Sequence, residues 1–417
     1  MKSKFVAISL FTGVGGLDFG FEAAGFHTAV AVEFDPLACR TVRLNRPKWG
    51  LLEGDIHSIS SNHILELAGL KPGEADVLIG GPPCQPFSKS SYWVRGDSLR
   101  LDDSRADTLT AYLRVLRDTR PKTFLLENVY GLAYKGKDEG LRHLLDGIRQ
   151  INHDVGTNYV VTWKMLNAAH YGVPQRRERV FLIGSRDGAT FTFPAPTHGH
   201  TKEGELFAGC EPFRTAWDAI GDLTCLKDDP SLKVGGKWGD LLPSIPEGQN
   251  YLWHTERSGG KSLFGWRTRY WSFLLKLAKN QPSWTIQAQP GSAIGPFHWR
   301  NRRLTNHELC RLQTFPDDLI FEEGRTIVQK HVGNAVPSLL GEVLARAIRK
   351  QLLGDRKDLG PLKLIPPIRP GMPAPEPLQE VPEKYSSLLG KHADHPGTRK
   401  GRRGVAAEHA PPLIVSE

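Results

Sequence analysis

Cysteine and long apolar runs are both scarce in this 417-residue chain. Its five cysteines are scattered, and no two of them form a Cys-x-x-Cys pair. A disulfide framework or a zinc site is therefore not expected, and a reducing compartment is the simpler setting. No apolar run approaches the ~18 residues of a membrane span, and no secretory apolar region follows the first four residues. The sequence predicts a cytoplasmic protein without a resident metal.

The excess of positive charge is modest. Fifty-four Lys and Arg against forty-five Asp and Glu give a net charge of +9 and a pI near 9.2. This balance suits a polyanionic partner, but a basic soluble surface explains it equally well. The length exceeds the usual size of one domain, so we expect two structural lobes.

The first ~185 residues alternate short apolar runs with helical patterns, which is typical of repeated βα units. This alternation predicts an α/β fold. The expected strands are residues 5–10, 28–33, 76–80, 123–127, 159–166 and 179–184. The expected helices are residues 17–24, 36–45, 62–69, 105–118 and 139–151.

The remaining chain divides into three parts by texture. Residues 186–300 are loop-rich, with a helical pattern only at 271–279, and hold seven of the ten tryptophans, which we expect mainly to fill this lobe's core. Residues 301–355 return to helical patterns, including a capping-box spacing at Thr305 and Glu308. Residues 356–417 are rich in proline and end near a basic run at 399–403. This tail is predicted to be extended and largely disordered.

One cysteine occupies a position suited to chemistry. Cys84 lies in the segment 81–88, just beyond the apolar strand 76–80, and three prolines stiffen the segment around it. Ligands of open α/β sheets bind at this end of the strands. A nucleophile and a small buried hydrophobe both remain open from this segment alone, because a nucleophilic cysteine needs partners elsewhere.

A glycine-rich turn follows the first strand. Phe11, Gly13 and Gly15 lie in it, but Asp18 replaces the last glycine of a Gly-x-Gly-x-x-Gly pattern, so a dinucleotide-binding dehydrogenase is disfavoured. Glu33 ends the next strand, where a carboxylate can accept hydrogen bonds from ribose hydroxyls or simply lie on the surface. Further motifs are Glu127 at a strand end, an arginine cluster at 175–179, and segments 302–305, 312–317 and 332–337.

Taken in this order, the motifs resemble those of the S-adenosylmethionine-dependent DNA cytosine carbon-5 methyltransferases of prokaryotic restriction-modification type. The resemblance covers about residues 4–185 and 300–350. It implies a Rossmann-like mixed sheet with helices on both faces, plus a smaller target-recognition lobe at 186–300. It also assigns S-adenosylmethionine to a pocket formed by Phe11, Gly13, Gly15, Glu33, Asp55, Pro83, Asn334 and Val336.

The same resemblance assigns the reaction. It implies that Cys84 attacks carbon 6 of a flipped cytosine, with Glu127 at ring nitrogen 3 and Arg179 at the exocyclic oxygen. Arg177 is the more structural of the two motif arginines. The implied DNA contacts are Gln85 and Ser88, which match motif positions, and Arg267 and Arg269 in the cationic stretch 266–270.

The implied partner is double-stranded DNA, with a cognate restriction endonuclease acting on the same site and the enzyme itself a monomer. No rule links this lobe's sequence to a recognition site. Two other readings remain open: a tRNA cytosine-5 methyltransferase, and a DNA-binding relative without catalytic activity. The size of the lobe at 186–300 favours DNA over tRNA, and the presence of Cys84, Glu127 and Arg179 argues for catalysis.

Overall fold

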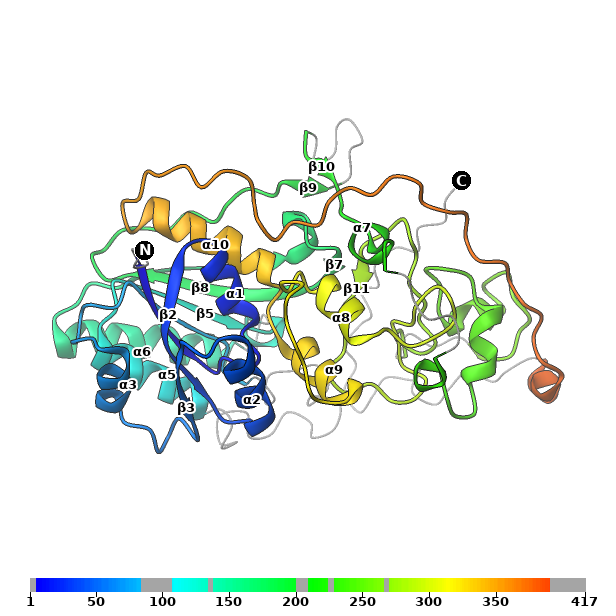
Figure 1. The fold of residues 1–417 in the computed structure, drawn as a ribbon, viewed down its shortest axis with the longest axis horizontal. Coiled ribbons are helices and arrows are strands. Elements are labelled where there is room, and N and C mark those ends of the chain that lie inside the picture. The colour runs from blue at the N-terminus through cyan, green and yellow to red at the C-terminus, as the bar shows by residue number, and fades with distance from the viewer. Residues whose placement is uncertain are drawn as a thin grey trace.

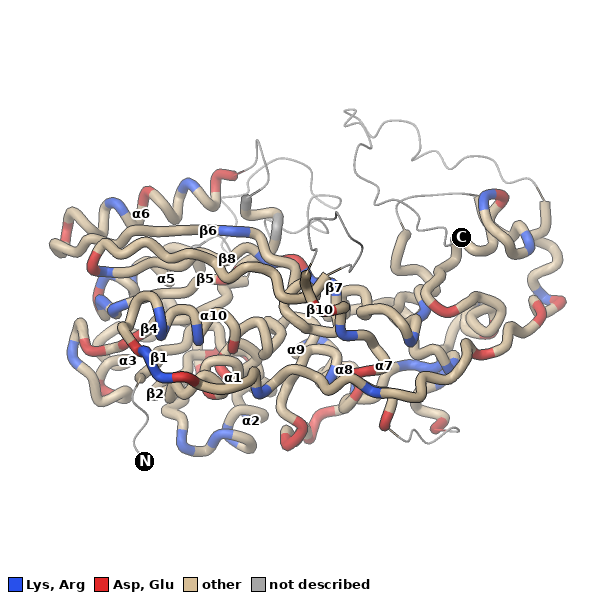
Figure 2. The backbone as a smooth tube through the Cα atoms, turned by 90° about the horizontal axis from the view of Figure 1, so that it is seen from above, with Lys and Arg blue, Asp and Glu red and all other residues tan. Residues whose placement is uncertain are grey.

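The computed structural model describes residues 5–83, 107–133, 138–199, 209–223, 229–265 and 270–390. Its first lobe is built on a seven-stranded sheet of order β3-β2-β1-β4-β5-β8-β6, seen from above in Figure 2. All strands run parallel except β8, which is antiparallel to both neighbours. The strands are β1 (Phe5–Leu10), β2 (Phe26–Glu33), β3 (Gly50–Glu53), β4 (Val77–Gly80), β5 (Thr123–Asn128), β6 (Val160–Asn167) and β8 (Glu178–Ser185). The chain order reverses between β1 and β4, which is where such sheets bind ligands.

Helices cover both faces of this sheet. The first face carries α3 (Ser61–Ala68), α5 (Asp107–Thr119) and α6 (Glu139–Val155), and the second carries α1 (Gly16–Ala23) and α10 (Ser338–Gln351). Side chains alternate between the faces because successive residues of a strand point to opposite sides. The predicted mixed α/β fold is confirmed.

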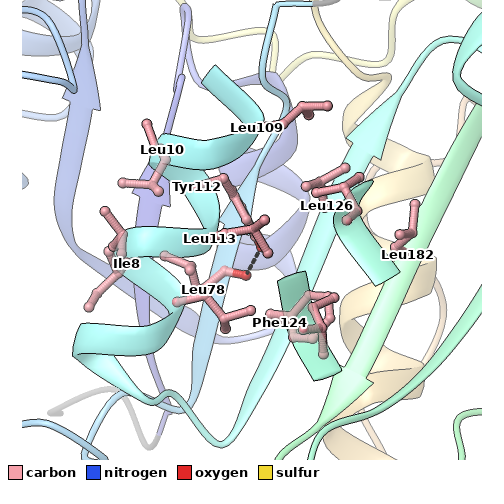
Figure 3. Close-up of a cluster of buried hydrophobic side chains, with 14 of the residues drawn as sticks. Ile8, Leu10, Leu78, Leu109, Tyr112, Leu113, Phe124, Leu126 and Leu182 are labelled. Carbon is pink, nitrogen blue, oxygen red and sulfur yellow. Dashed lines mark hydrogen bonds between the residues drawn. The ribbon is translucent and has the colours of Figure 1, made fainter. Parts of the chain in front are cut away.

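The first face holds a buried apolar cluster, shown in Figure 3. Ile8 and Leu10 contribute from β1, and Tyr112 contributes from α5. The Tyr112 hydroxyl donates to the carbonyls of Leu78 in β4 and Leu125 in β5, at 3.3 and 3.1 Å. This bond holds α5 against the two strands whose ends lead to the candidate catalytic residues.

The second lobe, residues 186–300, has little regular structure, and the elements in its described part are short. They are the strands β9 (His198–Gly199), β10 (Glu211–Pro212) and β11 (Ser283–Trp284), the helix α7 (Ala216–Ile220) and the 3-10 helices η4 (Pro230–Leu232), η5 (Gly239–Ser244) and η6 (Tyr251–His254). Among its described tryptophans only Trp299 is fully buried, whereas Trp217, Trp238 and Trp253 are half-buried at cluster edges. The expectation that tryptophans mainly fill this core therefore holds only in part.

The helix predicted at residues 271–279 is wrong. Leu274 has φ +52°, and its amide donates to the carbonyl of Ala293 at 2.8 Å. The amide of Leu277 likewise donates to Phe297 at 2.8 Å. The apolar residues thus bury themselves by pairing with the segment around 293–297 instead of by forming a helix.

Several elements were not expected from the sequence, a strand and a helix of the first lobe's sheet and return segment among them. Strand β3 has four residues, and helix α9 (Arg325–Asn334) carries no side-chain cap at its first residue. The expected capping box at Thr305 and Glu308 is confirmed at the start of α8 (Asn306–Leu312). None of the helices in the described ranges is long and apolar enough to span a bilayer.

Residues 355–390, called the strap below, follow α10 and run as extended chain along both lobes (Figure 1). Lys363 and Leu364 donate their amides to the carboxylate of Glu342 in α10. Arg369 donates its amide to Asp218 in α7 (Ala216–Ile220), at 2.8 Å. The strap therefore connects the first lobe to the start of the second.

The end of the strap packs into the second lobe. Tyr385, in η7 (Glu383–Leu388), is 3% exposed and stacks on Trp238 with ring centroids 5.8 Å apart. Its hydroxyl donates to the carbonyl of Lys237 at 2.8 Å. The segment is extended as expected, but up to residue 390 it is anchored where disorder was predicted. Residues 391–417 lie outside the described chain.

Candidate active site

The glycine-rich turn (residues 11–16) lies at the carboxyl end of β1. Phe11, Gly13 and Gly15 have φ values of +55°, +56° and +92°, in the left-handed region. A Cβ atom on Gly13 would have no atom within 4 Å, so the backbone faces open space at this point. Glycine accommodates this conformation at no steric cost, which explains the glycines at positions 13 and 15.

Glu33, at the end of β2, holds the turn directly. Its Oε2 accepts a hydrogen bond from the Gly13 amide at 2.7 Å, and its Oε1 accepts one from the Asp35 amide at 2.8 Å. A carboxylate has about four lone-pair sites, so each oxygen retains one further acceptor position. Asp55 follows β3 and is exposed, with its Oδ1 accepting from the His57 amide at 3.0 Å.

A buried polar network that the sequence did not suggest lies beneath the turn. Asp18 is 1% exposed and accepts hydrogen bonds from the hydroxyls of Ser9 and Thr28, each at 3.1 Å. Ser9 also bonds the Thr12 hydroxyl at 2.9 Å. Burial raises the pKa of Asp18 to about 7, although the two hydroxyl donors oppose the shift. No arginine or lysine pairs with this carboxyl in its hydrogen-bond set.

The carboxyl-terminal segment of the fold returns to the same turn. A Cβ atom on Gly16 would lie 2.6 Å from the carbonyl oxygen of Val336 and 2.9 Å from Cβ of Ala335. Asn334 is exposed at the end of α9. Lys330 in the same helix bonds the Asp35 carboxylate at 2.6 Å. The structure thus brings residues 334–336 beside the amino-terminal turn, as the sequence predicts.

Glu127 and Arg179 form a buried ion pair. Glu127 ends β5, Arg179 lies on the neighbouring β8, and Nε to Oε1 measures 2.8 Å. The side chains are 10% and 15% exposed. Burial raises the pKa of Glu127, while Arg179 and Arg177 oppose the rise. A buried carboxyl with a raised pKa is suited to holding or supplying a proton near neutral pH.

This pair lies beside the segment that leads to Cys84. A Cβ atom on Gly81 would be 2.8 Å from Oε2 of Glu127, so only glycine leaves room for the carboxylate. The Asn128 side-chain amide donates to the carbonyl of Pro82 at 3.4 Å. Pro83 is described and exposed. Cys84 itself lies outside the described residues, as do Gln85, Ser88, Arg267 and Arg269.

Arg177 is buried between the strands β7 (Gln175–Arg176) and β8, two residues before Arg179. It is 1% exposed, and its Nη2 donates to the carbonyl of Gly333 at 2.8 Å. Its Nε and Nη1 are buried and have no hydrogen-bond acceptor among the described residues, and burial holds the pKa of this guanidinium well below its usual value. The structure therefore brings Arg177 to the end of α9, between the ion pair and the turn.

Comparison with known proteins places this site in a family. The model of the C-5 cytosine-specific DNA methylase family matches residues 5–350. The chain is 40% identical over 376 residues to the type II methyltransferase M.SacI of Streptomyces achromogenes. The aligned region covers 84% of this chain and 94% of that protein. It is 46% identical over 222 residues to the type II methyltransferase M.AquIA of Picosynechococcus, covering 52% of this chain and 88% of that protein.

Solved structures share the fold. A putative DNA modification methyltransferase encoded within an Escherichia coli prophage superposes with a TM-score of 0.58 at 24% identity, covering 84% of this chain and all (100%) of that one. A Spodoptera frugiperda DNMT2 variant gives 0.56 at 16% identity, covering 83% and 99%. On the evidence of the family match and of M.SacI, the chain belongs to the C-5 cytosine-specific DNA methylase family and is a DNA (cytosine-5-)-methyltransferase.

Proposed function

We propose that this enzyme methylates one cytosine within a specific duplex DNA sequence, after flipping it out of the helix, through a covalent adduct with Cys84. The observation that carries the proposal is the buried Glu127–Arg179 pair, 2.8 Å apart, beside the glycine that precedes Cys84 by three residues. A carboxyl with a raised pKa and a neighbouring guanidinium are chemically suited to one edge of a pyrimidine, where they meet a ring nitrogen and an exocyclic oxygen.

The residues at the glycine-rich turn fit S-adenosylmethionine. The open backbone at Gly13, the remaining acceptor positions of Glu33 and the exposed carboxylate of Asp55 lie at the ends of adjacent strands β1, β2 and β3. Phe11, Gly15, Pro83, Asn334 and Val336 complete the proposed pocket. When bound there, S-adenosylmethionine supplies an electrophilic methyl group to carbon 5 of the base.

The chain's own residues make carbon 5 nucleophilic. The Cys84 thiolate forms a bond to carbon 6, and the electron pair of the 5–6 double bond shifts through carbons 5 and 4 to nitrogen 3, which leaves carbon 5 as the nucleophilic end of an enamine. Glu127 holds or supplies the proton at nitrogen 3, and Arg179 stabilises charge on the exocyclic oxygen. After methylation a base removes the carbon-5 proton, the double bond re-forms and the sulfur leaves.

Recognition of the target is assigned to the second lobe. We propose a catalytic lobe at residues 1–185, a target-recognition lobe at 186–300 and a return to the catalytic lobe at 301–355, with Gln85, Ser88, Arg267 and Arg269 contacting DNA. In Figure 2 the backbone positions of Lys and Arg alternate with those of Asp and Glu over both lobes, so a local group of cations is a better candidate for phosphate contacts than the overall charge. We also propose that the enzyme is a cytoplasmic monomer that acts beside a cognate restriction endonuclease, and the type II methyltransferase names of its relatives agree with the endonuclease.

Trapping on a mechanism-based substrate tests the chemistry. DNA from a library of short duplexes containing 5-fluorocytosine should give a complex that survives denaturing electrophoresis only when S-adenosylmethionine is present. Fluorine cannot leave as a cation, so the sulfur cannot be eliminated. Glu127→Gln should slow trapping far more than it weakens DNA binding, whereas Glu66→Gln, an exposed residue of α3, should leave it unchanged.

The outcomes separate the alternatives. Trapping with fluorinated tRNA and not with DNA would move the substrate to RNA. Cofactor binding without any adduct would indicate a relative that has lost catalysis. An adduct formed equally well by Cys84→Ala would remove Cys84 from the mechanism.

A further inference from the structure

The motif at residues 312–317 takes no part in the proposed chemistry, yet its glutamine is completely buried. Gln313 follows α8 and is 0% exposed. Its Nε2 donates to the carbonyl of Val332 at 2.6 Å and lies 3.4 Å from that of Ala335. One side chain therefore bonds the backbone on both sides of the point where α9 ends. The segment that continues from this point, residues 335–336, is the one that packs on Gly16.

A second buried glutamine completes the arrangement. Gln175, also 0% exposed, lies in β7 (Gln175–Arg176) and donates through Nε2 to Oε1 of Gln313 at 3.1 Å. Its Oε1 accepts the amide of Ile286 at 3.1 Å. Strand β7 also pairs in parallel with β11 of the second lobe. The two glutamines thus join β7, the second lobe, the end of α8 and the end of α9.

The strand of Gln175 leads directly to the ion pair. Gln175 lies in β7, Arg177 lies between β7 and β8, and Arg179 lies near the start of β8, so four residues of chain connect Gln175 to the ion pair. Gln175 bonds Gln313, Arg177 bonds the carbonyl of Gly333, and Arg179 pairs with Glu127. The end of α9 has little freedom to shift, because a Cβ atom on Gly333 would lie 2.7 Å from the backbone of Ala288.

The motif also caps the last helix of the fold. Helix α10 begins after Pro337 without a side-chain cap of its own. Its first two amides instead donate to the Gln313 carbonyl, at 3.1 Å from Ser338, and to the Thr314 hydroxyl, at 2.9 Å from Leu339. These are amides that a helix cannot satisfy internally.

We infer that Gln313 is a positioning residue, which through Gln175 fixes the distance between the cofactor-side segment 333–336 and the catalytic pair Glu127–Arg179. It touches neither cytosine nor cofactor. The inference rests on the proposed function, because methyl transfer requires the cofactor-side segment and the catalytic pair to be held at a fixed distance. Misplacement of reacting groups by about 1 Å can slow a reaction by ~100-fold, and a buried amide pair resists such drift because breaking it leaves buried polar groups unpaired.

Gln313→Leu tests the inference, because leucine is close in volume and cannot hydrogen-bond. The matched control is Gln329→Leu, which removes a 6%-exposed glutamine of α9 whose side chain, within the described part of the chain, bonds the carbonyl of Gln287. In the protein without cofactor, hydrogen exchange of the amides at 335–339 should accelerate in Gln313→Leu and remain unchanged in the control. The S-adenosylmethionine dissociation constant and the rate of 5-fluorocytosine trapping should each worsen by ~10-fold or more in Gln313→Leu alone.

Gln313→Glu allows a second measurement, the pH dependence of cofactor affinity, which a loss of packing alone would not change. A protonated glutamic acid can donate to the Val332 carbonyl while its other oxygen accepts from Gln175, but an ionised one cannot. The affinity of Gln313→Glu for S-adenosylmethionine, relative to wild type, should therefore rise as the pH is lowered from about 8 to about 6. The same ratio for Gln313→Leu should stay flat.

The results separate this inference from the proposed function. Equal effects of Gln313→Leu and Gln329→Leu on exchange, affinity and trapping would make Gln313 an ordinary core residue and overturn the inference. The double variant Gln175→Leu/Gln313→Leu should be little worse than either single variant, and additive losses would also overturn it. A wild-type protein that neither binds S-adenosylmethionine nor traps 5-fluorocytosine would overturn the proposed function first.

Discussion

Ending the chain after residue 354 should destabilise the second lobe and abolish methyl transfer, whereas ending it after residue 390 should not. The strap reaches both lobes: Lys363 and Leu364 bond Glu342, Arg369 bonds Asp218, and Tyr385 fills the second-lobe cluster. Removing it takes the amide donors from Glu342, a carboxylate that is 0% exposed. The shorter truncation leaves all of these contacts in place.

The magnitude of one anchor can be isolated with Tyr385→Ala. The side chain is 3% exposed, stacks on Trp238 and bonds the Lys237 carbonyl. Truncating a buried large aromatic residue costs ~3–5 kcal/mol of unfolding free energy. Urea unfolding followed by tryptophan fluorescence measures the loss, since Trp238 reports on the contact itself. The control is Tyr270→Ala, because Tyr270 is 45% exposed.

Two results would refute this reasoning. A protein ending at residue 354 with full specific activity would mean that the strap contributes nothing to the active form. Equal unfolding midpoints for Tyr385→Ala and Tyr270→Ala would mean that the tyrosine is not anchored in solution.

Three further predictions concern the active site. Cys84→Ser should abolish methyl transfer while S-adenosylmethionine binding, measured by calorimetry, stays within a few-fold of wild type; near-normal turnover would exclude the covalent step. Glu33→Ala should weaken cofactor binding by about 1.5–3 kcal/mol, and an unchanged dissociation constant would leave Glu33 with only its role of holding Gly13. The pKa of Asp18 is raised from 3.8 to about 7, so the folded state binds the extra proton and loses stability as the pH rises through this window. In Asp18→Asn the unfolding free energy should therefore change little between these pH values, and above pH 8 it should be higher than that of wild type by up to ~4 kcal/mol. Plots of unfolding free energy against pH that run parallel for the two proteins would contradict the raised pKa.

Most of the first lobe could be predicted because its signals are local. The apolar runs at β1, β4 and β5 and the capping box at Thr305 each depend on a few neighbouring residues. Residues 271–279 have a helix-like apolar spacing, but pairing with residues 293–297 satisfies the same backbone groups better. The sequence pattern of residues 271–279 alone does not show that residues 293–297 are available as partners, so it predicts a helix.

Some residues of the candidate site could likewise be predicted from local signals, and others could not. Glu33, Glu127 and Arg179 could be predicted as candidates because each lies at or near the end of a strand, and the sheet brings such ends together whether the strands are parallel or, like β8, antiparallel. The roles of Gln175 and Gln313 could not, because a buried amide is explained only by its partners, here 138 residues apart in sequence. Asp18 was noted only for breaking a glycine pattern, although its two hydroxyl donors come from β1 and β2.

The strap shows why a composition typical of disorder does not settle whether a segment is ordered. Prolines restrict the unfolded chain, so an extended proline-rich segment loses less conformational entropy when it binds along a surface. Whether such a segment is ordered depends on whether residues along it make contacts with the rest of the fold. Here the backbone amides of Lys363, Arg369 and Glu376 each donate to a carboxylate of the folded lobes. Tyr385 supplies a buried aromatic ring at the carboxyl end of the strap. A few such contacts offset a reduced entropic cost, and the segment becomes part of the fold.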